Sequence, residues 1–210
     1  MERVICLVIG YVLGLFQTGY FYGRMNNIDI RQYGSGNSGT TNALRVLGKK
    51  AGLIVFAGDF LKTVLACALA RILFADKPEM VSLLVVYAGF GAVLGHNYPF
   101  YLNFKGGKGI AATSGLIFFM DWRTTVICLI LFIGAVAITR FVSLGSLLVV
   151  TAMCITFCMF AAWGDFGLGA GYLYEFYGVT LVLTALAYWR HRANIVRLLH
   201  GTENKLGAKK

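Results

Sequence analysis

The sequence predicts an all-α, polytopic membrane protein with seven transmembrane helices. Hydrophobic residues make up 58% of the 210 residues and charged residues only 13%, and the mean hydropathy is +0.72. A soluble domain would carry about a quarter charged residues. The apolar residues form long unbroken runs, not the alternation of barrel strands. We therefore expect one integral-membrane domain over residues 1–210, with no room for a separate soluble domain.

Seven apolar runs mark the expected helices in chain order. The first, from Val4 to about Tyr22, is long enough to span, which favours a retained helix over a cleaved signal peptide. The fourth and fifth are short for a span, which needs roughly 20 residues. The fourth starts at the Gly106–Gly109 run, so its free N–H groups and positive dipole end would point at whatever lies there. The expected ranges are 4–23, 51–74, 81–98, 107–120, 124–139, 143–164 and 171–189.

The orientation follows from the distribution of Lys and Arg between the two sets of loops. One set carries fourteen of the 19 basic residues, the other carries four, and Lys62 lies inside the second apolar run. The richer set is therefore expected to be cytoplasmic, and with seven spans the N-terminus lies outside and the C-terminus inside. Much of the net charge of +10 is this ordinary bias. The poorer set holds Arg3, Arg71, Lys77 and Arg123, together with six acidic residues.

The first cytoplasmic loop, from Gly34 to Asn42, contains a literal Gly-x-Gly-x-x-Gly pattern. A dinucleotide fingerprint requires a preceding strand and a βαβ unit, and a membrane helix precedes this loop instead. Glycines still allow backbone N–H groups to approach phosphate oxygens. The alternative is a plain polar turn, which seldom needs three glycines and this many donors. The side-chain donors are Ser35, Asn37, Thr40, Thr41 and Asn42, and Arg45 follows within helical reach.

The second and third loops carry the remaining anion-binding residues. In the second, Lys105 and Lys108 flank Gly106 and Gly107, and His96 lies where the third run ends. In the third, helical spacing places Arg190, Asn194 and Arg197 on one face. The alternatives are a lysine anchor at lipid head groups and a basic helix end that binds anionic lipid. Further candidates on the same side are His191, Glu203 and Ser143.

Other polar and reactive residues have simpler interpretations. The five cysteines all lie in apolar runs without His or carboxylate company, so we expect core residues and no metal site. Asp59 and Lys62 lie one turn apart inside the second run, where charges are functional candidates by default, although such a pair can simply neutralise itself. We expect no nucleic-acid partner, because the sequence predicts no basic soluble domain.

Two other function classes compete with an enzyme. A transporter for a phosphorylated solute should show a polar path at the bilayer midplane and internal repeats, and only Asp59 and Lys62 approach such a path. A non-catalytic lipid-binding scaffold would not explain the first loop.

Taken in this order, the three loops resemble the bacterial acyl-phosphate:glycerol-3-phosphate acyltransferase family over essentially the whole chain. The matching patterns are the Gly-Ser-Gly-Asn loop that ends in Thr41-Asn42, the Gly-His…Phe-x-Gly-Gly-Lys-Gly stretch from Gly95 to Gly109, and the tail from Arg190 to Lys205. Ser38 stands where the family usually has Pro, and Thr40 where it often has Ala.

The resemblance implies a seven-helix enzyme of the bacterial plasma membrane, with its active site on the cytoplasmic side. It implies transfer of a fatty acyl group from acyl phosphate to the 1-hydroxyl of glycerol 3-phosphate, giving lysophosphatidic acid in phospholipid biosynthesis. No cofactor is expected. The partners are the two substrates, membrane lipid and, functionally, a soluble enzyme that produces acyl phosphate.

Acyl phosphate has a good leaving group, so positioning and electrostatic stabilisation can carry much of the rate. We assign the backbone and side chains of Ser35, Gly36 and Asn37 to the acyl phosphate and the developing oxyanion. His96 would orient or deprotonate the 1-hydroxyl, and a substrate phosphate oxygen is the alternative base. A His–Asp dyad at five-residue spacing is absent, because Tyr101 occupies that position. The expected substrate-binding residues are Thr41, Asn42, Arg45, Lys105, Gly106, Gly107, Lys108, Ser143, Arg190, His191, Asn194, Arg197 and Glu203.

Overall fold

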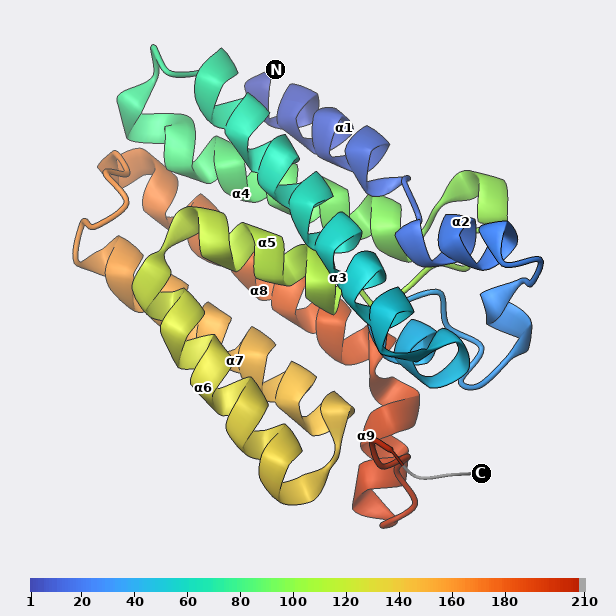
Figure 1. Ribbon diagram of the computed structural model, residues 1–210. Helices are drawn as coiled ribbons and strands as arrows, with labels where there is room; N and C mark the ends of the chain where they lie inside the picture. Colours follow the sequence, from blue (N-terminus) through green and yellow to red (C-terminus); the bar gives the residue numbers. More distant parts are fainter. Residues whose placement is uncertain (208–210) are drawn as a thin grey trace.

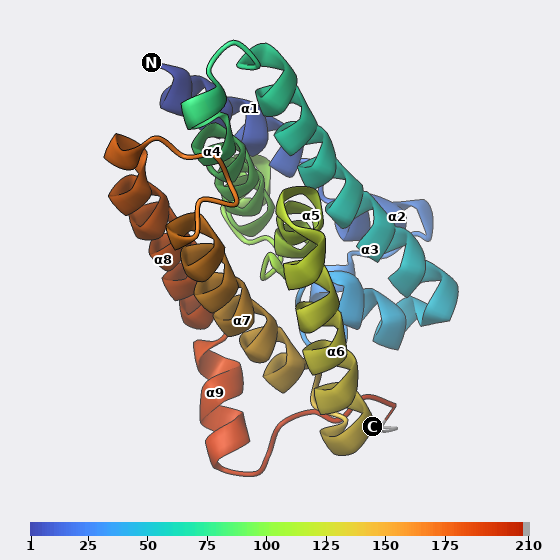
Figure 2. The same cartoon turned by 90° about the vertical axis from the view of Figure 1, so that its left-hand side faces the viewer.

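The computed structural model describes residues 1–207, and over this range it consists of helices and loops (Figure 1). The long helices run along one another in a bundle, and the N-terminus lies at the end opposite α9 (Figures 1 and 2). The helices are α1 (Glu2–Gly14), α2 (Thr18–Met25), α3 (Thr40–Leu73), α4 (Pro78–Asn97), α5 (Ile110–Met120), α6 (Trp122–Thr139), α7 (Val142–Ala162), α8 (Leu173–Arg190) and α9 (Arg192–Leu199), with short 3₁₀ turns at Ile30–Gln32, Phe100–Leu102 and Ala170–Tyr172.

The all-α membrane class is confirmed, with differences in detail from the expected spans. Six segments of the described chain are long and apolar enough to cross a membrane, and α5 is a shorter apolar helix. At 1.5 Å per residue the 11 residues of α5 cover about 16 Å, roughly half of a bilayer core. The count of seven crossings and the orientation of the termini stay predictions.

The first two expected spans have different boundaries in the structure. The run 4–23 is broken into α1 and α2, because the chain leaves the helix after Gly14 and restarts at Thr18. The second expected span corresponds to α3, which begins at Thr40 and not at residue 51, and which bends at Gly48, whose φ is +87°. The early start matters for function, since it places the N-terminus of α3 directly after the first glycine loop.

The core centres on α4, which packs against α1 through small residues. A Cβ atom at Gly10 would lie 2.0 Å from the carbonyl oxygen of Ala88, and one at Gly95 would lie 2.2 Å from that of Tyr11. Such close backbone approach is typical of membrane helix pairs with small residues four apart. It brings the end of α1 against the end of α4, where His96 lies.

An ionic cluster holds the opposite end of the bundle together. Arg3 on α1 forms an ion pair with Glu175 on α8 (Nη2 to Oε2, 2.7 Å), and the hydroxyl of Tyr87 on α4 donates to the same carboxylate at 2.8 Å. This cluster lies far along the bundle from the glycine loops, so it stabilises the scaffold without entering the site described next.

Candidate active site

The first glycine loop is organised by the side chain of Asn42. Its Nδ2 donates to the carbonyl oxygens of Ile30 and Tyr33, both at 3.0 Å, and its Oδ1 accepts from the backbone N–H of Ser35 at 2.8 Å. The backbone N–H of Gly36 donates to Tyr33 O at 3.0 Å. Two of the backbone donors expected to face an acyl phosphate are therefore used inside the loop, and the Asn42 amide serves the loop in the same way.

The N-terminus of α3 supplies backbone N–H donors that were not expected, because the second span was predicted to begin at residue 51. Gly39 is the N-cap and no side chain caps this end. The N–H groups of Thr40 and Thr41 lie in the first turn, where helices have no internal acceptor for them. The hydroxyl of Thr40 is also buried without a hydrogen-bond partner among the described residues. A second uncapped helix N-terminus, that of α5, follows Gly109.

The second glycine loop folds back onto the end of α4. The N–H groups of Gly106 and Gly107 donate to Asn97 O and His96 O, each at 3.1 Å. Arg190 holds the outer side of the same turn, because its Nη2 donates to Gly106 O (3.1 Å) and Gly107 O (2.7 Å). Gly106 and Gly107 are thus buried parts of the frame and do not line the cavity.

The two lysines of this loop lie on opposite sides of the turn. Lys108 lines the cavity, whereas Lys105 is exposed and lies outside it. The contact of Lys105 with substrate stays a prediction, and in this structure its side chain is not part of the cavity lining. Asn103 and Phe104 adopt left-handed φ values of +53° and +58°, and this turn swings residue 105 outward.

The third element closes the site through a chain of hydrogen bonds. Lys108 donates to Oδ1 of Asn194, the Nδ2 of Asn194 donates to Glu203 Oε1 at 2.9 Å, and Nε of Arg197 pairs with Glu203 Oε2 at 2.8 Å. Glu203 therefore positions Asn194 and Arg197. Glu203 and Asp59 are the two acidic residues in the lining of a cavity that is otherwise rich in cations.

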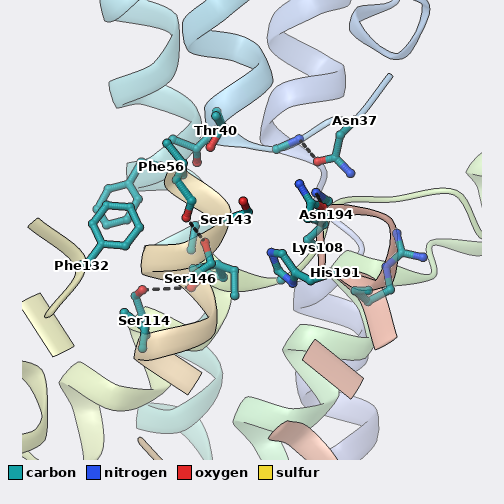
Figure 3. Close-up of a pocket in the computed structure, with 18 of the residues that line it drawn as sticks. Asn37, Thr40, Phe56, Lys108, Ser114, Phe132, Ser143, Ser146, His191 and Asn194 are labelled. Carbon is teal, nitrogen blue, oxygen red and sulfur yellow. Dashed lines mark hydrogen bonds between the residues drawn. The ribbon is translucent and has the colours of Figure 1, made fainter. Parts of the chain in front are cut away.

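These elements enclose one end of a cavity of about 690 Å³ (Figure 3). The end of the cavity that is predicted to face the cytoplasm is polar and cationic. Its lining includes Arg45, Lys108, Arg190 and Arg197. Its other end is an apolar channel between α3, α5, α6 and α7. The channel is lined by Phe56, Phe60, Ile117, Cys128, Leu129, Phe132, Ile133, Val142 and Val149, with Ser114, Thr125 and Ser146 interspersed.

Burial and the neighbouring cations together disfavour the charged form of Lys108. Burial, followed by the like charges of Arg197, Arg190 and Arg45, lowers the pKa of Lys108 to about 8, although Glu203 opposes the shift. A ligand with two or more negative charges would relieve this repulsion. The arrangement is that of an anion site.

The Nδ1 atoms of the two buried histidines of the site have different neighbours. Nδ1 of His191 lies 2.8 Å from Ala187 O, an atom that can only accept, so Nδ1 bears the hydrogen and Nε2 is the bare acceptor. Burial lowers the pKa of His191 to about 4, which keeps the ring neutral near pH 7. Nδ1 of His96, by contrast, lies 3.0 Å from the ammonium of Lys62.

The structure brings most of the expected site residues to one cavity. Ser143 has a buried hydroxyl without a partner among the described residues, and it faces this space. Gly36, Lys105, Gly106 and Gly107 stand outside the lining. The other expected residues, namely Ser35, Asn37, Thr41, Asn42, Arg45, His96, Lys108, Ser143, Arg190, His191, Asn194, Arg197 and Glu203, all line it.

Sequence reasoning missed two parts of the site. Thr40 was seen only as a general donor, although Gly39 followed by two threonines is a signal for a helix start. The apolar channel has no local signature, because its residues come from four helices that are all apolar.

An all-helical membrane bundle with a buried cationic site that continues into an apolar channel has the two environments that a phosphorylated, lipid-like ligand requires. Comparison with known proteins agrees. A model of the glycerol-3-phosphate acyltransferase family matches residues 4–201, and the chain belongs to that family.

Relatives and solved structures extend the match over the full length. Glycerol-3-phosphate acyltransferase of Halalkalibacterium halodurans is 42% identical over 212 residues, covering 100% of this chain and 98% of the relative. That of Clostridioides difficile is 43% identical, covering 99% and 97%. The crystal structure of PlsY (YgiH), an integral membrane glycerol 3-phosphate acyltransferase in its glycerol 3-phosphate form, superposes with a TM-score of 0.82 at 32% identity, covering 99% of this chain and 96% of that one.

Proposed function

We propose that this protein transfers a fatty acyl group from acyl phosphate to the sn-1 hydroxyl of glycerol 3-phosphate, giving lysophosphatidic acid and inorganic phosphate. The observation that carries the proposal is the single cavity whose cationic end continues into an apolar channel. A phosphorylated head and a fatty chain need those two environments side by side. The family membership supports the acyltransfer, and the chemistry of the site supports the choice of donor.

The acyl phosphate lies across the junction of the two parts. Its chain follows the apolar channel past Phe132 and Cys128, and its phosphoryl group meets the N-termini of α3 and α5, where free N–H groups and the helix dipoles favour an anion. The side chains of Ser35 and Asn37 stand at the same place and face the developing oxyanion. Nothing in this arrangement requires the bulky nucleotide of an acyl-coenzyme A.

The phosphate of glycerol 3-phosphate occupies the cationic end. Lys108, Arg45 and Arg197 line it, with Asn194 and the unpartnered hydroxyl of Ser143 beside them. Charge-assisted hydrogen bonds of this kind are about twice as strong as neutral ones. Both Lys105 and Lys108 were expected to bind substrate, and of the two Lys108 lines the cavity.

The reaction is one acyl transfer without an enzyme-bound intermediate. The 1-hydroxyl oxygen attacks the acyl carbonyl carbon and forms the ester bond, while the bond from that carbon to the phosphate oxygen breaks and phosphate leaves with the electron pair. The hydroxyl proton goes to a substrate phosphate oxygen or to the bare Nε2 of His191, which lines the same cavity. The nearby cations stabilise the charge that gathers on the leaving phosphate.

The glycine loops and α9 face the cytoplasm in this proposal, because the basic residues gather in the loops at that end. Glycerol 3-phosphate then enters from the aqueous side of a bacterial plasma membrane, and a soluble enzyme that makes acyl phosphate supplies the donor. The product remains in the lipid.

The test uses purified, detergent-solubilised protein with palmitoyl phosphate and radiolabelled glycerol 3-phosphate, without coenzyme A. Labelled 1-acyl lysophosphatidic acid is the expected product, and palmitoyl-coenzyme A in place of palmitoyl phosphate should give little. Equal turnover of the two donors would reject the donor assignment. A 2-acyl product would reject the position of attack.

A further inference from the structure

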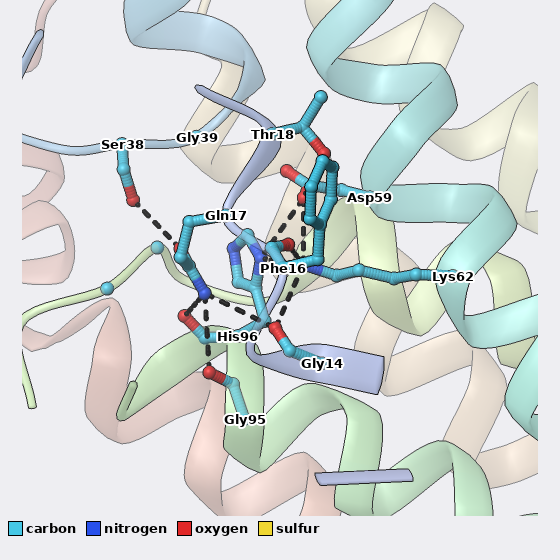
Figure 4. Close-up of polar contacts among 12 residues, drawn as sticks. Gly14, Phe16, Gln17, Thr18, Ser38, Gly39, Asp59, Lys62, Gly95 and His96 are labelled. Atoms are coloured by element: carbon cyan, nitrogen blue, oxygen red, sulfur yellow. Dashed lines mark hydrogen bonds and ion pairs between the residues drawn. The ribbon is translucent and has the colours of Figure 1, made fainter. Parts of the chain in front are cut away.

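A buried ionic network lies beneath the two glycine loops, centred on Lys62 of α3 (Figure 4). The Nζ of Lys62 lies 2.7 Å from Phe16 O, 3.2 Å from Gly14 O and 2.9 Å from Asp59 Oδ1. It also lies 3.0 Å from His96 Nδ1. The side chains are almost fully enclosed, at 7% exposure for Lys62, 1% for Asp59 and 3% for His96.

The contacts decide the protonation of both partners. Four acceptors surround the Nζ of Lys62, and the three hydrogens of an ammonium point to the three nearest, Phe16 O, Asp59 Oδ1 and His96 Nδ1, while Gly14 O at 3.2 Å shares one of them. The carboxylate of Asp59 at 2.9 Å favours the charged form of Lys62, which has no lone pair, so Nδ1 of His96 accepts in their 3.0 Å contact. Nδ1 also lies 3.5 Å from Asp59 Oδ1, a longer distance than that to Lys62 and beyond the usual range of a hydrogen bond. His96 is therefore a neutral ring with its hydrogen on Nε2.

The opposite edge of the His96 ring supports the second glycine loop. A Cβ atom at Gly107 would lie 1.9 Å from Nε2, so the loop backbone rests directly on the imidazole. The carbonyl of His96 accepts from the N–H of Gly107 at 3.1 Å. Lys108 is the next residue along, so the orientation of this ring sets the position of the cation at the anion site.

The network around His96 also anchors the first glycine loop. Gln17, at the break between α1 and α2, donates through Nε2 to His96 O at 3.0 Å, and its Oε1 accepts from the hydroxyl of Ser38 at 3.3 Å. Lys62 holds the break itself through the carbonyls of Gly14 and Phe16. Thr18 donates to Asp59 Oδ1 at 3.1 Å and ties the start of α2 to the pair.

We propose that Asp59 and Lys62 are positioning residues that fix His96 as a neutral Nε2–H tautomer and thereby hold both glycine loops in the geometry that binds anions. In this role His96 is a donor and a platform, not the base. The inference rests on the proposed function for its activity readout only. A buried ion pair contributes little net stability compared with apolar side chains of similar size, so its presence calls for a geometric reason.

The direct test is nitrogen-15 NMR of histidine-labelled protein in detergent. The chain has only three histidines, and His96→Gln assigns the signal of interest by its disappearance. The expected spectrum shows a pyridine-like Nδ1 and a pyrrole-like Nε2 for His96. A pyrrole-like Nδ1 with a bare Nε2, or a doubly protonated ring, would overturn the inference.

A kinetic test uses Asp59→Asn/Lys62→Met, which removes both charges and leaves no isolated buried ion. Thr156→Val, which removes a buried hydroxyl between α6 and α7 far from the network, is the matched control. We expect the double variant to lose about 10²-fold in kcat, as for a small misplacement of catalytic groups, with a higher KM for glycerol 3-phosphate and a His96 signal that is no longer a single tautomer. The control should keep wild-type kinetics.

The outcomes separate the inference from the proposed function. Wild-type protein that makes no lysophosphatidic acid contradicts the function, while the NMR result on the same protein still decides the tautomer. An active wild type with an equally active double variant contradicts the positioning role. Should the double variant not fold, the wild-type spectrum alone supports or rejects the inference.

Discussion

Lys108 donates a hydrogen bond to Oδ1 of Asn194 across the polar end of the cavity, so one ammonium group joins the second glycine loop to α9. The contact brings together residues 86 positions apart in sequence. Because Asn194 is in turn held by Glu203, the position of Lys108 depends on the fold of the C-terminal segment.

We predict that replacing each lysine of the second loop by Met has very different effects on kcat/KM for glycerol 3-phosphate. Lys108→Met should weaken glycerol 3-phosphate use by about tenfold to a hundredfold, because a charge-assisted phosphate bond contributes about 1.5–3 kcal/mol. Lys105→Met should change kcat/KM little, since Lys105 lies outside the cavity. The measurement is kcat/KM for glycerol 3-phosphate at saturating palmitoyl phosphate. The reverse ranking would mean that the loop turns over when substrate binds.

The lowered pKa of Lys108 predicts proton uptake when glycerol 3-phosphate binds. Below pH 8 the lysine is charged in the free enzyme, and binding needs no proton at this group. Above pH 8 the free enzyme loses that proton, while a bound phosphate dianion raises the pKa again, so Kd should rise about tenfold per pH unit. Calorimetry in buffers of different ionisation enthalpy measures the uptake directly. Lys108→Met should abolish this alkaline dependence, and an unchanged dependence in that variant would assign it to another group.

We predict that Asn42 matters through the shape of the first loop. Asn42→Asp keeps the acceptor for Ser35 N–H but loses the two donors to Ile30 O and Tyr33 O. Each unsatisfied buried partner costs about 1–3 kcal/mol, so both thermal stability and kcat should fall. Thermal unfolding and kcat of the purified variant are the measurements. Loss of activity at wild-type stability would instead favour direct contact with substrate.

The fold class and the three loops could be predicted because both are local in sequence. Each apolar run is one continuous stretch of sequence, and the glycines of each loop lie within a few positions of their Ser, Thr and Asn neighbours. The roles of Lys105 and Lys108 could not, since they depend on left-handed φ angles at Asn103 and Phe104, residues that carry no glycine signal.

The hydropathy of the sequence did not predict the break after α1 either. It is stabilised by Lys62, whose ammonium satisfies the carbonyls of Gly14 and Phe16 from 46 to 48 residues away. Only Gln17 and Thr18 interrupt the apolar run at the break, and two polar residues leave its mean hydropathy high enough to predict one helix.

We predict that Gly36 can be replaced by Asn with less damage than by Ala. Its φ is +70°, and a Cβ atom would meet only Arg31 O at 3.4 Å, so the cost is backbone strain and not a clash. That strain is about 1–2 kcal/mol for an ordinary residue and smaller for Asn. Lysophosphatidic acid formation should therefore rank wild type above Gly36→Asn, and Gly36→Asn above Gly36→Ala. Two equally inactive variants would indicate that the backbone at Gly36 must approach substrate more closely than in this structure.

The apolar channel predicts that α6 sets the preferred length of the acyl chain. Thr125, Cys128 and Phe132 recur at helical spacing and line the same wall of the cavity. Cys128→Phe should fill the channel part-way along, so that the end of a long chain no longer fits. Each methylene excluded from it costs about 0.8 kcal/mol of burial. The ratio of kcat/KM for decanoyl phosphate to that for palmitoyl phosphate should therefore rise by at least about tenfold. Ile130→Phe is the matched control, because Ile130 lies on the same helix with 65% of its surface exposed and outside the cavity. An unchanged ratio in an active Cys128→Phe enzyme would show that the acyl chain takes another route.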